Sequence, residues 1–322
     1  MIKKEFYFPS ADGKTTIHAV KWLPDGKVKA VLQVSHGVTE HMLRYEGFSK
    51  YFTEKGFVIV GNDHIGHGTS IAEGAEPMYF GPVGSWDWVV ADMHTCKTIA
   101  KEEFPNVPYG MLGFSLGSFV VRSYLIHHPG EIDAAILIGT GHTLALQLVL
   151  AKWIANREAD KVGEEHTSSA IKQLTFETYN KMFAPNRTEY DWLNSNEKVL
   201  DEYIADPLRG QYFSAGLFRE LLSAMEFTGK KKELKKMNPD TPVFFASGTK
   251  DPVGDCGKGV LRAYRYFLEA GVKDVSMKMY PELRHDILRE AGSDKIYNDI
   301  CRWLKQRMFK NHYEDGMNGE NS

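Results

Sequence analysis

A chain of 322 residues, with 43% hydrophobic and 25% charged residues, has an ordinary globular composition and is long enough to bury a large core. A net charge of −3 provides no basic field, so no nucleic-acid partner is expected. The three cysteines are far apart in the chain, which argues against a disulfide framework or a cysteine zinc site.

We expect neither a signal peptide nor a membrane-spanning helix. The N-terminus lacks the long apolar core of a signal peptide, and no stretch approaches the roughly 18 apolar residues of a membrane-spanning helix. We therefore expect a cytoplasmic protein. Residues 313–322 are polar and rich in glycine and asparagine, and this composition predicts a flexible tail.

The first 140 residues alternate short β-branched runs with amphipathic stretches. Strands are predicted at 16–23, 30–35, 57–61, 109–114 and 134–138, and helices at 43–55, 86–104 and 116–128. Ser85 lies just before the second helix and Asp87 falls in its first turn, a typical helix start. This alternation favours a parallel sheet covered by helices on both faces.

The pattern changes after the strand at 134–138. From about His142 to Asn238 the sequence has helical stretches and no convincing strand. Strands then return at 242–247 and 274–280, with helices at 259–270 and 293–310. We predict one α/β domain made of 1–142 and 239–312, interrupted by a helical insertion at 143–238.

The pentapeptide GFSLG at 113–117 matches the pattern G-x-S-x-G, with an apolar strand before it and a helical pattern after it. In a nucleophile elbow, the central serine lies on a strained turn at the carboxyl end of the strand. Side chains two residues away would collide, so Gly113 and Gly117 are the expected elbow glycines. Ser115 is the predicted nucleophile, and an ordinary βα turn with packing glycines is the alternative.

The predicted oxyanion hole combines two backbone amides. One is that of Leu116, directly after the nucleophile, and the other comes from the loop after an early strand. His36 and Gly37 follow such a strand, so we assign the second donor to Val38. His36 is expected to be structural because it comes too early in the chain order to be the catalytic base.

The acid and the base of such a site follow the serine in the chain. Asp251 comes after the strand at 242–247, and His285 comes after the strand at 274–280, so both belong at the edge of the sheet where the serine lies. Asp255 is the rival acid. His312 is the other histidine near the C-terminus, but it lies in polar sequence.

These residue types suit acyl transfer. A serine hydroxyl is a weak nucleophile, and a neutral imidazole activates it by taking its proton and later returns that proton to the leaving group. A carboxylate holds the tautomer of the imidazole and stabilises the imidazolium. We therefore predict a serine hydrolase that works through an acyl-enzyme intermediate.

The motifs together resemble the monoacylglycerol lipase and lysophospholipase group of the α/β-hydrolases. The segments that carry the resemblance are HGVTEHMLRYEGFSKYF (36–52), NDHIGHGTS (62–70), GSWDWVVADMHTCKTIAKEEFP (84–105), GMLGFSLGSFVVRSY (110–124), SGTKDPVGDCGKGV (247–260) and YPELRHDILRE (280–290). They cover most of the predicted α/β domain, and the resemblance fades across 143–238.

This resemblance implies the α/β-hydrolase fold, with a mostly parallel sheet, helices on both faces and a helical cap inserted after the sixth strand. The family's triad falls on Ser115, Asp251 and His285, and its oxyanion donors fall on Val38 and Leu116. It further implies hydrolysis of monoacylglycerols, lysophospholipids or related small acyl esters, with no metal or organic cofactor. Acyl length, leaving group and oligomeric state stay open.

The most apolar stretch of the chain, residues 144–155, opens the insertion. It is expected to line an acyl tunnel; packing against the core and transient contact with a membrane surface are alternatives. The lysine-rich run at 229–236 is expected to be a solvated face, with contact to anionic lipid headgroups as the alternative.

Three other functions share these motifs. An aminopeptidase uses the same triad, and an acyltransferase passes the acyl group to an alcohol instead of water. A low-turnover ligand-binding protein can retain the fold and the triad. A serine at the elbow argues against dehalogenases and epoxide hydrolases of this fold, which carry aspartate there.

Overall fold

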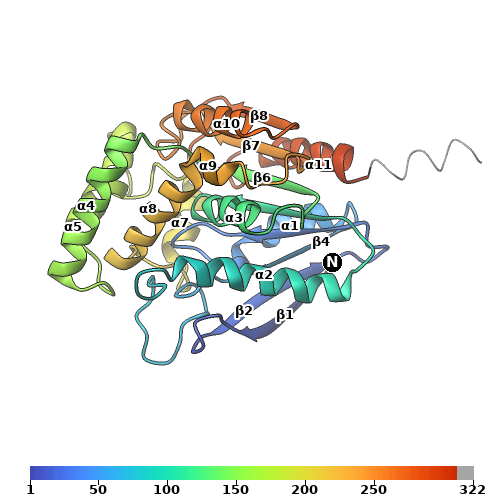
Figure 1. The fold of residues 1–322 in the computed structure, drawn as a ribbon, viewed down its shortest axis with the longest axis horizontal. Helices are drawn as coiled ribbons and strands as arrows, with labels where there is room; N and C mark the ends of the chain where they lie inside the picture. The colour runs from blue at the N-terminus through green and yellow to red at the C-terminus, as the bar shows by residue number, and fades with distance from the viewer. Residues whose placement is uncertain (310–322) are drawn as a thin grey trace, which may run out of the picture.

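The computed structural model describes residues 1–309, and they form one eight-stranded sheet with helices on both faces (Figure 1). The strands follow the order β1-β2-β4-β3-β5-β6-β7-β8. Their bounds are Ile2–Pro9 (β1), Thr16–Leu23 (β2), Ala30–Ser35 (β3), Phe57–Asn62 (β4), Tyr109–Phe114 (β5), Ala134–Ile138 (β6), Val243–Gly248 (β7) and Val275–Tyr280 (β8). β2 pairs antiparallel with β1 and β4, and the other pairs are parallel.

Helices join the parallel strands and cover the sheet. Their bounds are Glu46–Thr53 (α1), Trp86–Glu103 (α2), Leu116–His127 (α3), Ala145–Val162 (α4), Ser169–Lys172 (α5), Thr178–Asn180 (α6), Glu197–Ala205 (α7), Ala215–Gly229 (α8), Lys231–Leu234 (α9), Lys258–Ala270 (α10) and Ser293–Met308 (α11). Three short helical turns lie at Met42–Tyr45 (η1), Gln173–Glu177 (η2) and Lys181–Phe183 (η3).

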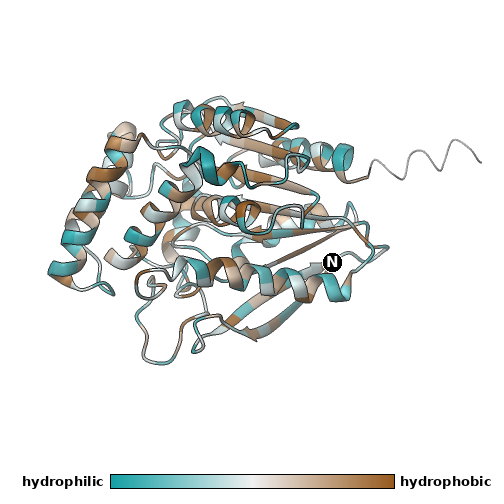
Figure 2. Cartoon of the chain, in the orientation of Figure 1, coloured by the Kyte–Doolittle hydropathy of each residue, from teal (hydrophilic) through white to brown (hydrophobic). Residues whose placement is uncertain are grey.

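Burial explains why the central strands are continuous apolar runs. Every residue of β3, β4, β5, β6 and β7 is buried. Parallel strands are covered on both faces, so neither face needs to be polar. One hydrophobic cluster packs α2, α3 and α10 on one face of the sheet, and a second packs α1 and α11 on the other. Figure 2 shows apolar strands between helices of mixed polarity.

The insertion lies where the sequence predicts it. β6 and β7 are neighbours in the sheet, yet residues 139–242 between them contain helices and no strand. This confirms a helical insertion after the sixth strand. The boundaries 143 and 238 remain a prediction, and we call residues 143–238 the cap segment. Its helices α4, α5 and α8 lie at one end of the molecule, on the left in Figure 1.

The structure differs from the sequence prediction at two places. β1 was not predicted, because most of its side chains are exposed and its partner is the next strand rather than a core. Ser85 precedes α2 as expected, but its side chain makes no capping hydrogen bond. Instead the carboxylate of Glu220, on α8, accepts the backbone amides of Gly84 and Trp86. A side chain from the cap segment thus satisfies backbone amides at the N-terminus of α2.

Two sequence predictions lie outside the described residues. The predicted tail, 313–322, is one, and His312 is the other. The predicted C-terminal helix is observed as α11, which ends at Met308.

Candidate active site

Ser115 lies between the end of β5 and the start of α3, in the conformation that an elbow requires. Its φ of 52° and ψ of −118° lie outside the regions that non-glycine residues ordinarily occupy. Such strain persists only where the surroundings hold it. Here the Ser115 amide donates to the carbonyl of Ile138 on β6, at 2.8 Å. The turn leaves the serine side chain half-buried at the carboxyl edge of the sheet.

Both elbow glycines lie where no side chain fits. A Cβ on Gly113 would stand 2.3 Å from the Gly117 carbonyl oxygen, and one on Gly117 would stand 2.0 Å from that of Ser35. Backbone atoms cannot move away as a flexible side chain can. The close approach of β3, β5 and α3 therefore requires glycine at these two positions.

Asp251 and His285 form a buried pair. Nδ1 of His285 lies 2.8 Å from Oδ1 of Asp251, and both side chains are almost fully inaccessible. The carboxylate also accepts the Val253 amide at 2.9 Å and the Ser247 hydroxyl at 3.0 Å. The rival acid Asp255 is exposed and pairs with Arg262. The chain therefore brings Asp251, and not Asp255, to the histidine.

The imidazole of His285 is packed beside the elbow. Its ring centroid lies 5.0 Å from that of Phe114, the residue before Ser115. A Cβ on Gly139 would stand 2.8 Å from its Cε1, so a glycine there lets the ring approach β6. Nε2 is buried and has no hydrogen-bond partner within residues 1–309, so it makes no hydrogen bond with Ser115 in this structure. Catalytic hydrogen bonds are often formed only when substrate is bound.

The two predicted oxyanion donors are available. Leu116 is the first residue of α3, so its amide has no acceptor within the helix. Val38 lies in the loop after β3, and neither amide has an acceptor in the part of the chain that the structure describes. Gly37 is also tightly placed, since a Cβ there would stand 3.0 Å from the Phe114 ring.

A buried carboxylate holds residues 36–39, the loop after β3 that carries the predicted donor Val38. We call these residues the oxyanion loop. Glu40 accepts the Gly37 amide at 2.7 Å and the Tyr45 hydroxyl at 2.8 Å. Burial alone would raise the pKa of Glu40, but the charges of Arg289 and Arg44 outweigh burial and hold the pKa below its usual value. An ionised Glu40 thus fixes the backbone that carries the Val38 amide. The sequence reasoning missed this role, although Glu40 lies within the segment HGVTEHMLRY.

Three other histidines form a buried cluster with tilted and edge-on rings, close to the same loop. The ring centroids of His36 and His64 lie 4.1 Å apart, and those of His36 and His67 lie 5.3 Å apart. His36 accepts the amide of His64 at 3.0 Å, which makes it structural, as expected. Burial lowers the pKa of His64 to about 3 and that of His67 to about 4, so both rings are neutral near pH 7.

The cap segment contributes groups that the sequence reasoning also missed. The ring of Trp192 packs 5.2 Å from that of His285, and its carbonyl accepts the His285 amide at 3.4 Å. Tyr203 on α7 hydrogen-bonds with Thr39 of the oxyanion loop at 2.7 Å. The sequence carries no signal for these contacts, because 11 of the 96 residues of the cap segment are aromatic, no more than the 12% of the whole chain. The cap segment therefore contacts both His285 and the loop after β3.

A strained serine, a buried acid–histidine pair and two available amides at one edge of a parallel sheet are the parts of an α/β-hydrolase site. A family model described as "Serine aminopeptidase, S33" matches residues 26–292. The chain belongs to this family of α/β-hydrolases.

Named relatives of similar length agree. A monoacylglycerol lipase of Mycolicibacterium smegmatis is 25% identical over 307 residues, covering 94% of this chain and 97% of that protein. The human monoglyceride lipase is 26% identical over 295 residues, covering 89% of this chain and 86% of that protein. These relatives confirm the prediction of a monoacylglycerol lipase-like serine hydrolase that cleaves carboxylic esters.

Solved structures confirm the fold. A thermostable carboxyl esterase from Bacillus coagulans, in complex with glycerol, superposes with a TM-score of 0.88 at 25% identity, covering 96% of this chain and 99% of that one. A soluble variant of the monoglyceride lipase of Saccharomyces cerevisiae superposes with a TM-score of 0.73 at 16% identity, covering 96% of each chain. Within residues 1–309, no helix has the length and apolar character needed to cross a bilayer.

Proposed function

We propose that this hydrolase cleaves monoacylglycerols or closely related single-chain acyl esters, with Ser115, His285 and Asp251 as its triad. The observation that carries the assignment is the buried Asp251–His285 pair, packed through Phe114 against the strained turn of Ser115. The named lipase relatives support the substrate class.

In this proposal His285 Nε2 accepts the proton of the Ser115 hydroxyl as its oxygen attacks the ester carbonyl. Asp251 holds the proton on Nδ1 and stabilises the imidazolium. The Val38 and Leu116 amides bind the oxyanion, and removal of one such donor typically costs about 3 kcal/mol of transition-state stabilisation. The alcohol leaves with the proton from His285, and water then releases the acyl group by the same steps.

The nucleophile is tested with Ser115→Ala. We expect this variant to keep the fold, judged by its circular dichroism and unfolding midpoint, and to lose labelling by a fluorophosphonate probe. Ser49→Ala is the matched control, since Ser49 is a fully buried serine on α1 whose hydroxyl has no hydrogen-bond partner within residues 1–309. Labelling that persists in Ser115→Ala would overturn the assignment.

We further propose residues 143–238 as a cap domain that selects substrate. A groove of about 560 Å³ lies between α4 and α8, and its lining combines apolar side chains such as Leu148, Trp153 and Met225 with the charged Lys152 and Glu226. The apolar part of this lining could hold an acyl chain. Exchanging the cap segment for that of a relative should change chain-length preference while leaving fluorophosphonate reactivity unchanged.

Contact of the cap with a lipid surface is a second part of the proposal. The solvent-facing side of α4 and the residue before it carry large apolar side chains that are at least half exposed: Leu144, Leu146, Val149, Leu150 and Trp153. A helix of this kind can bury its apolar face at a lipid interface. Cosedimentation with phosphatidylcholine vesicles tests the contact, which should weaken when these residues are replaced by serine.

The family description makes an aminopeptidase the second candidate. Such an enzyme needs a carboxylate that is free to bind the ammonium group of its substrate. Glu40, the carboxylate nearest in sequence to the oxyanion donor Val38, is already neutralised by Arg44 and Arg289. An assay with monoacylglycerols, lysophospholipids and aminoacyl amides separates the candidates, and release from the amides alone would favour the peptidase.

A cytoplasmic location stays a prediction from the sequence, and a fluorescent fusion in the source cell would test it.

A further inference from the structure

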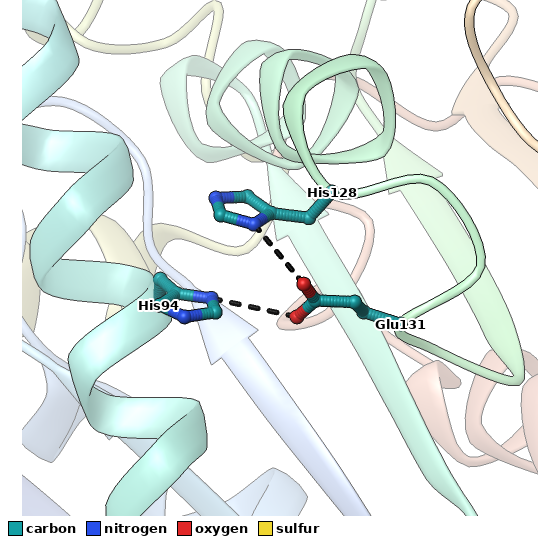
Figure 3. A group of neighbouring side chains, drawn as sticks. All are labelled: His94, His128 and Glu131. Carbon is teal, nitrogen blue, oxygen red and sulfur yellow. Dashed lines mark hydrogen bonds and ion pairs between the residues drawn. The ribbon is translucent and has the colours of Figure 1, made fainter.

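Two histidines and a glutamate gather on the side of the molecule formed by α2 and α3. His94 lies in the middle of α2, His128 follows the end of α3, and Glu131 lies in the loop leading to β6. Figure 3 shows both rings turned toward the Glu131 carboxylate. Each residue offers one possible ligand atom, and these three atoms lie within 4.8 Å of one another. All three side chains are partly exposed, so an ion could enter from solvent.

The distances from each imidazole to the carboxylate match the spacing of ligands around a shared ion. His128 Nδ1 lies 3.3 Å from Glu131 Oε1, and His94 Nδ1 lies 3.5 Å from Oε2. Both exceed the usual 2.7–3.2 Å range of N–H···O bonds. Ligands of a tetrahedral zinc ion at bond lengths of about 2.05 Å are separated by about 3.3 Å. The imidazole rings are stacked 4.2 Å apart at 10°, so one ring has to tilt for the lone pairs of both Nδ1 atoms to converge on one ion.

We propose that His94, His128 and Glu131 form a binding site for a divalent transition-metal ion of the zinc type. Two imidazoles and one carboxylate are ligands that zinc prefers, and water would complete the coordination. Tyr124 supports the carboxylate, since its hydroxyl donates to Oε2 at 3.0 Å and also lies 3.1 Å from His94 Nδ1. Carboxylate ligands of metals are commonly held by hydrogen bonds of this kind.

Lys97 competes for the same carboxylate. Its Nζ lies 2.7 Å from Oε2 of Glu131, where the ion would bind. A lysine side chain is flexible and can move into solvent, so a metal ion could take the place of the Lys97 ammonium group beside Glu131. This competition gives the proposal a distinctive consequence. Removing the Lys97 charge should strengthen metal binding, whereas removing any ligand should weaken it.

The ion would act on stability and not on the chemical step. α3 has 12 residues and begins directly after Ser115, so at about 1.5 Å per residue the site lies about 18 Å from the nucleophile. An ion bound there joins the end of α3 to the middle of α2. Because it binds only the folded chain, it should raise the unfolding midpoint.

The test is a titration of the full chain with Zn²⁺, followed by calorimetry. We expect one ion to bind at micromolar concentration, with the affinity reduced about 10-fold or more by His94→Ala or Glu131→Gln. Lys97→Gln should bind more tightly than the wild type. His127→Ala is the matched control. His127 is the last residue of α3, next to His128, and it is exposed, but its ring stacks on that of Phe227 and not on that of His94.

Substitution with Co²⁺ gives a second readout that does not depend on stability, because its visible absorption reports tetrahedral nitrogen and oxygen ligands. The bands should appear in the wild type and in His127→Ala and be lost in His94→Ala. Equal affinity for Zn²⁺ in His94→Ala and His127→Ala would overturn the proposal, as would Lys97→Gln binding no more tightly than the wild type.

Discussion

The sheet and the cap segment bury their apolar residues to very different extents. The five central strands from β3 to β7 have no exposed residue. In α4, by contrast, Leu146 is 83% exposed and Val149 is 66% exposed. Apolar sequence therefore does two things in this chain. In the sheet it supplies the packing that holds a strained serine in place, and in the cap it forms an exposed surface that we propose as a contact for an apolar ligand or interface.

The largest effect is expected at the edge of the sheet, from replacement of the carboxylate that pairs with His285. Asp251→Asn should leave the fold intact but lower kcat by about 10⁴-fold, because an amide cannot hold the required tautomer or stabilise the imidazolium. Steady-state hydrolysis of a p-nitrophenyl ester measures it. Asp255→Asn is the control and should retain most of the activity, since that side chain is exposed and pairs with Arg262. Equal losses in the two variants would contradict the assignment of the acid.

Next in size is the loss of a side chain from the core. Phe245 on β7 is fully buried and contacts Phe267 edge to face, with ring centroids 5.1 Å apart. Phe245→Ala should lower the free energy of unfolding by about 3–5 kcal/mol, because it leaves a cavity. Urea denaturation gives the value. A loss below about 1 kcal/mol would mean that the sheet packs less tightly than described.

A smaller effect is expected from pH, through the buried histidines beside the oxyanion loop. The unfolded chain binds protons on histidine near pH 6.5, whereas burial lowers the pKa of His64 to about 3 and of His67 to about 4. Stability should therefore be full above pH 6.5 and fall as the pH drops toward 4, by roughly 1.4 kcal/mol per pH unit for each group.

Asp92 acts in the opposite direction. Burial raises its pKa to about 6, so the folded chain binds that proton before the unfolded chain does. One such carboxyl offsets one histidine, and a net loss remains, because burial also lowers the pKa of His36 well below its usual value. Urea midpoints at pH 7, 6 and 5 measure it. A midpoint that stays constant over this range would show that the two rings are not neutral in the folded chain.

The smallest effect is expected on the exposed face of the cap. Leu146→Ser should change the free energy of unfolding by less than about 0.5 kcal/mol, because the side chain makes little contact with the protein. Leu148→Ser, two residues later on the buried side of α4, is the matched control and should destabilise the protein strongly. A large loss from Leu146→Ser would show that α4 packs against something, such as a second copy of the chain.

The sequence was most informative where local rules act. The strand–turn–helix pattern around Ser115 predicted β5 and α3, to within one residue at the end of the helix. Chain order alone brought Asp251 and His285 to the same edge of the sheet, because both follow parallel strands. β1 escaped prediction because an exposed edge strand has no buried face to set its pattern.

By itself, the sequence determined that a helical segment interrupts the sheet, and it predicted the three residues that we propose as the triad. Periodicity and glycine spacing are local properties, and chain order sets the edge of the sheet at which each loop lies. Only the tertiary structure decided which groups surround that chemistry: Trp192 against the His285 ring, Glu40 beneath the oxyanion loop and Glu220 at the start of α2. These contacts join residues far apart in the chain, where helix and strand patterns carry no information about which faces meet.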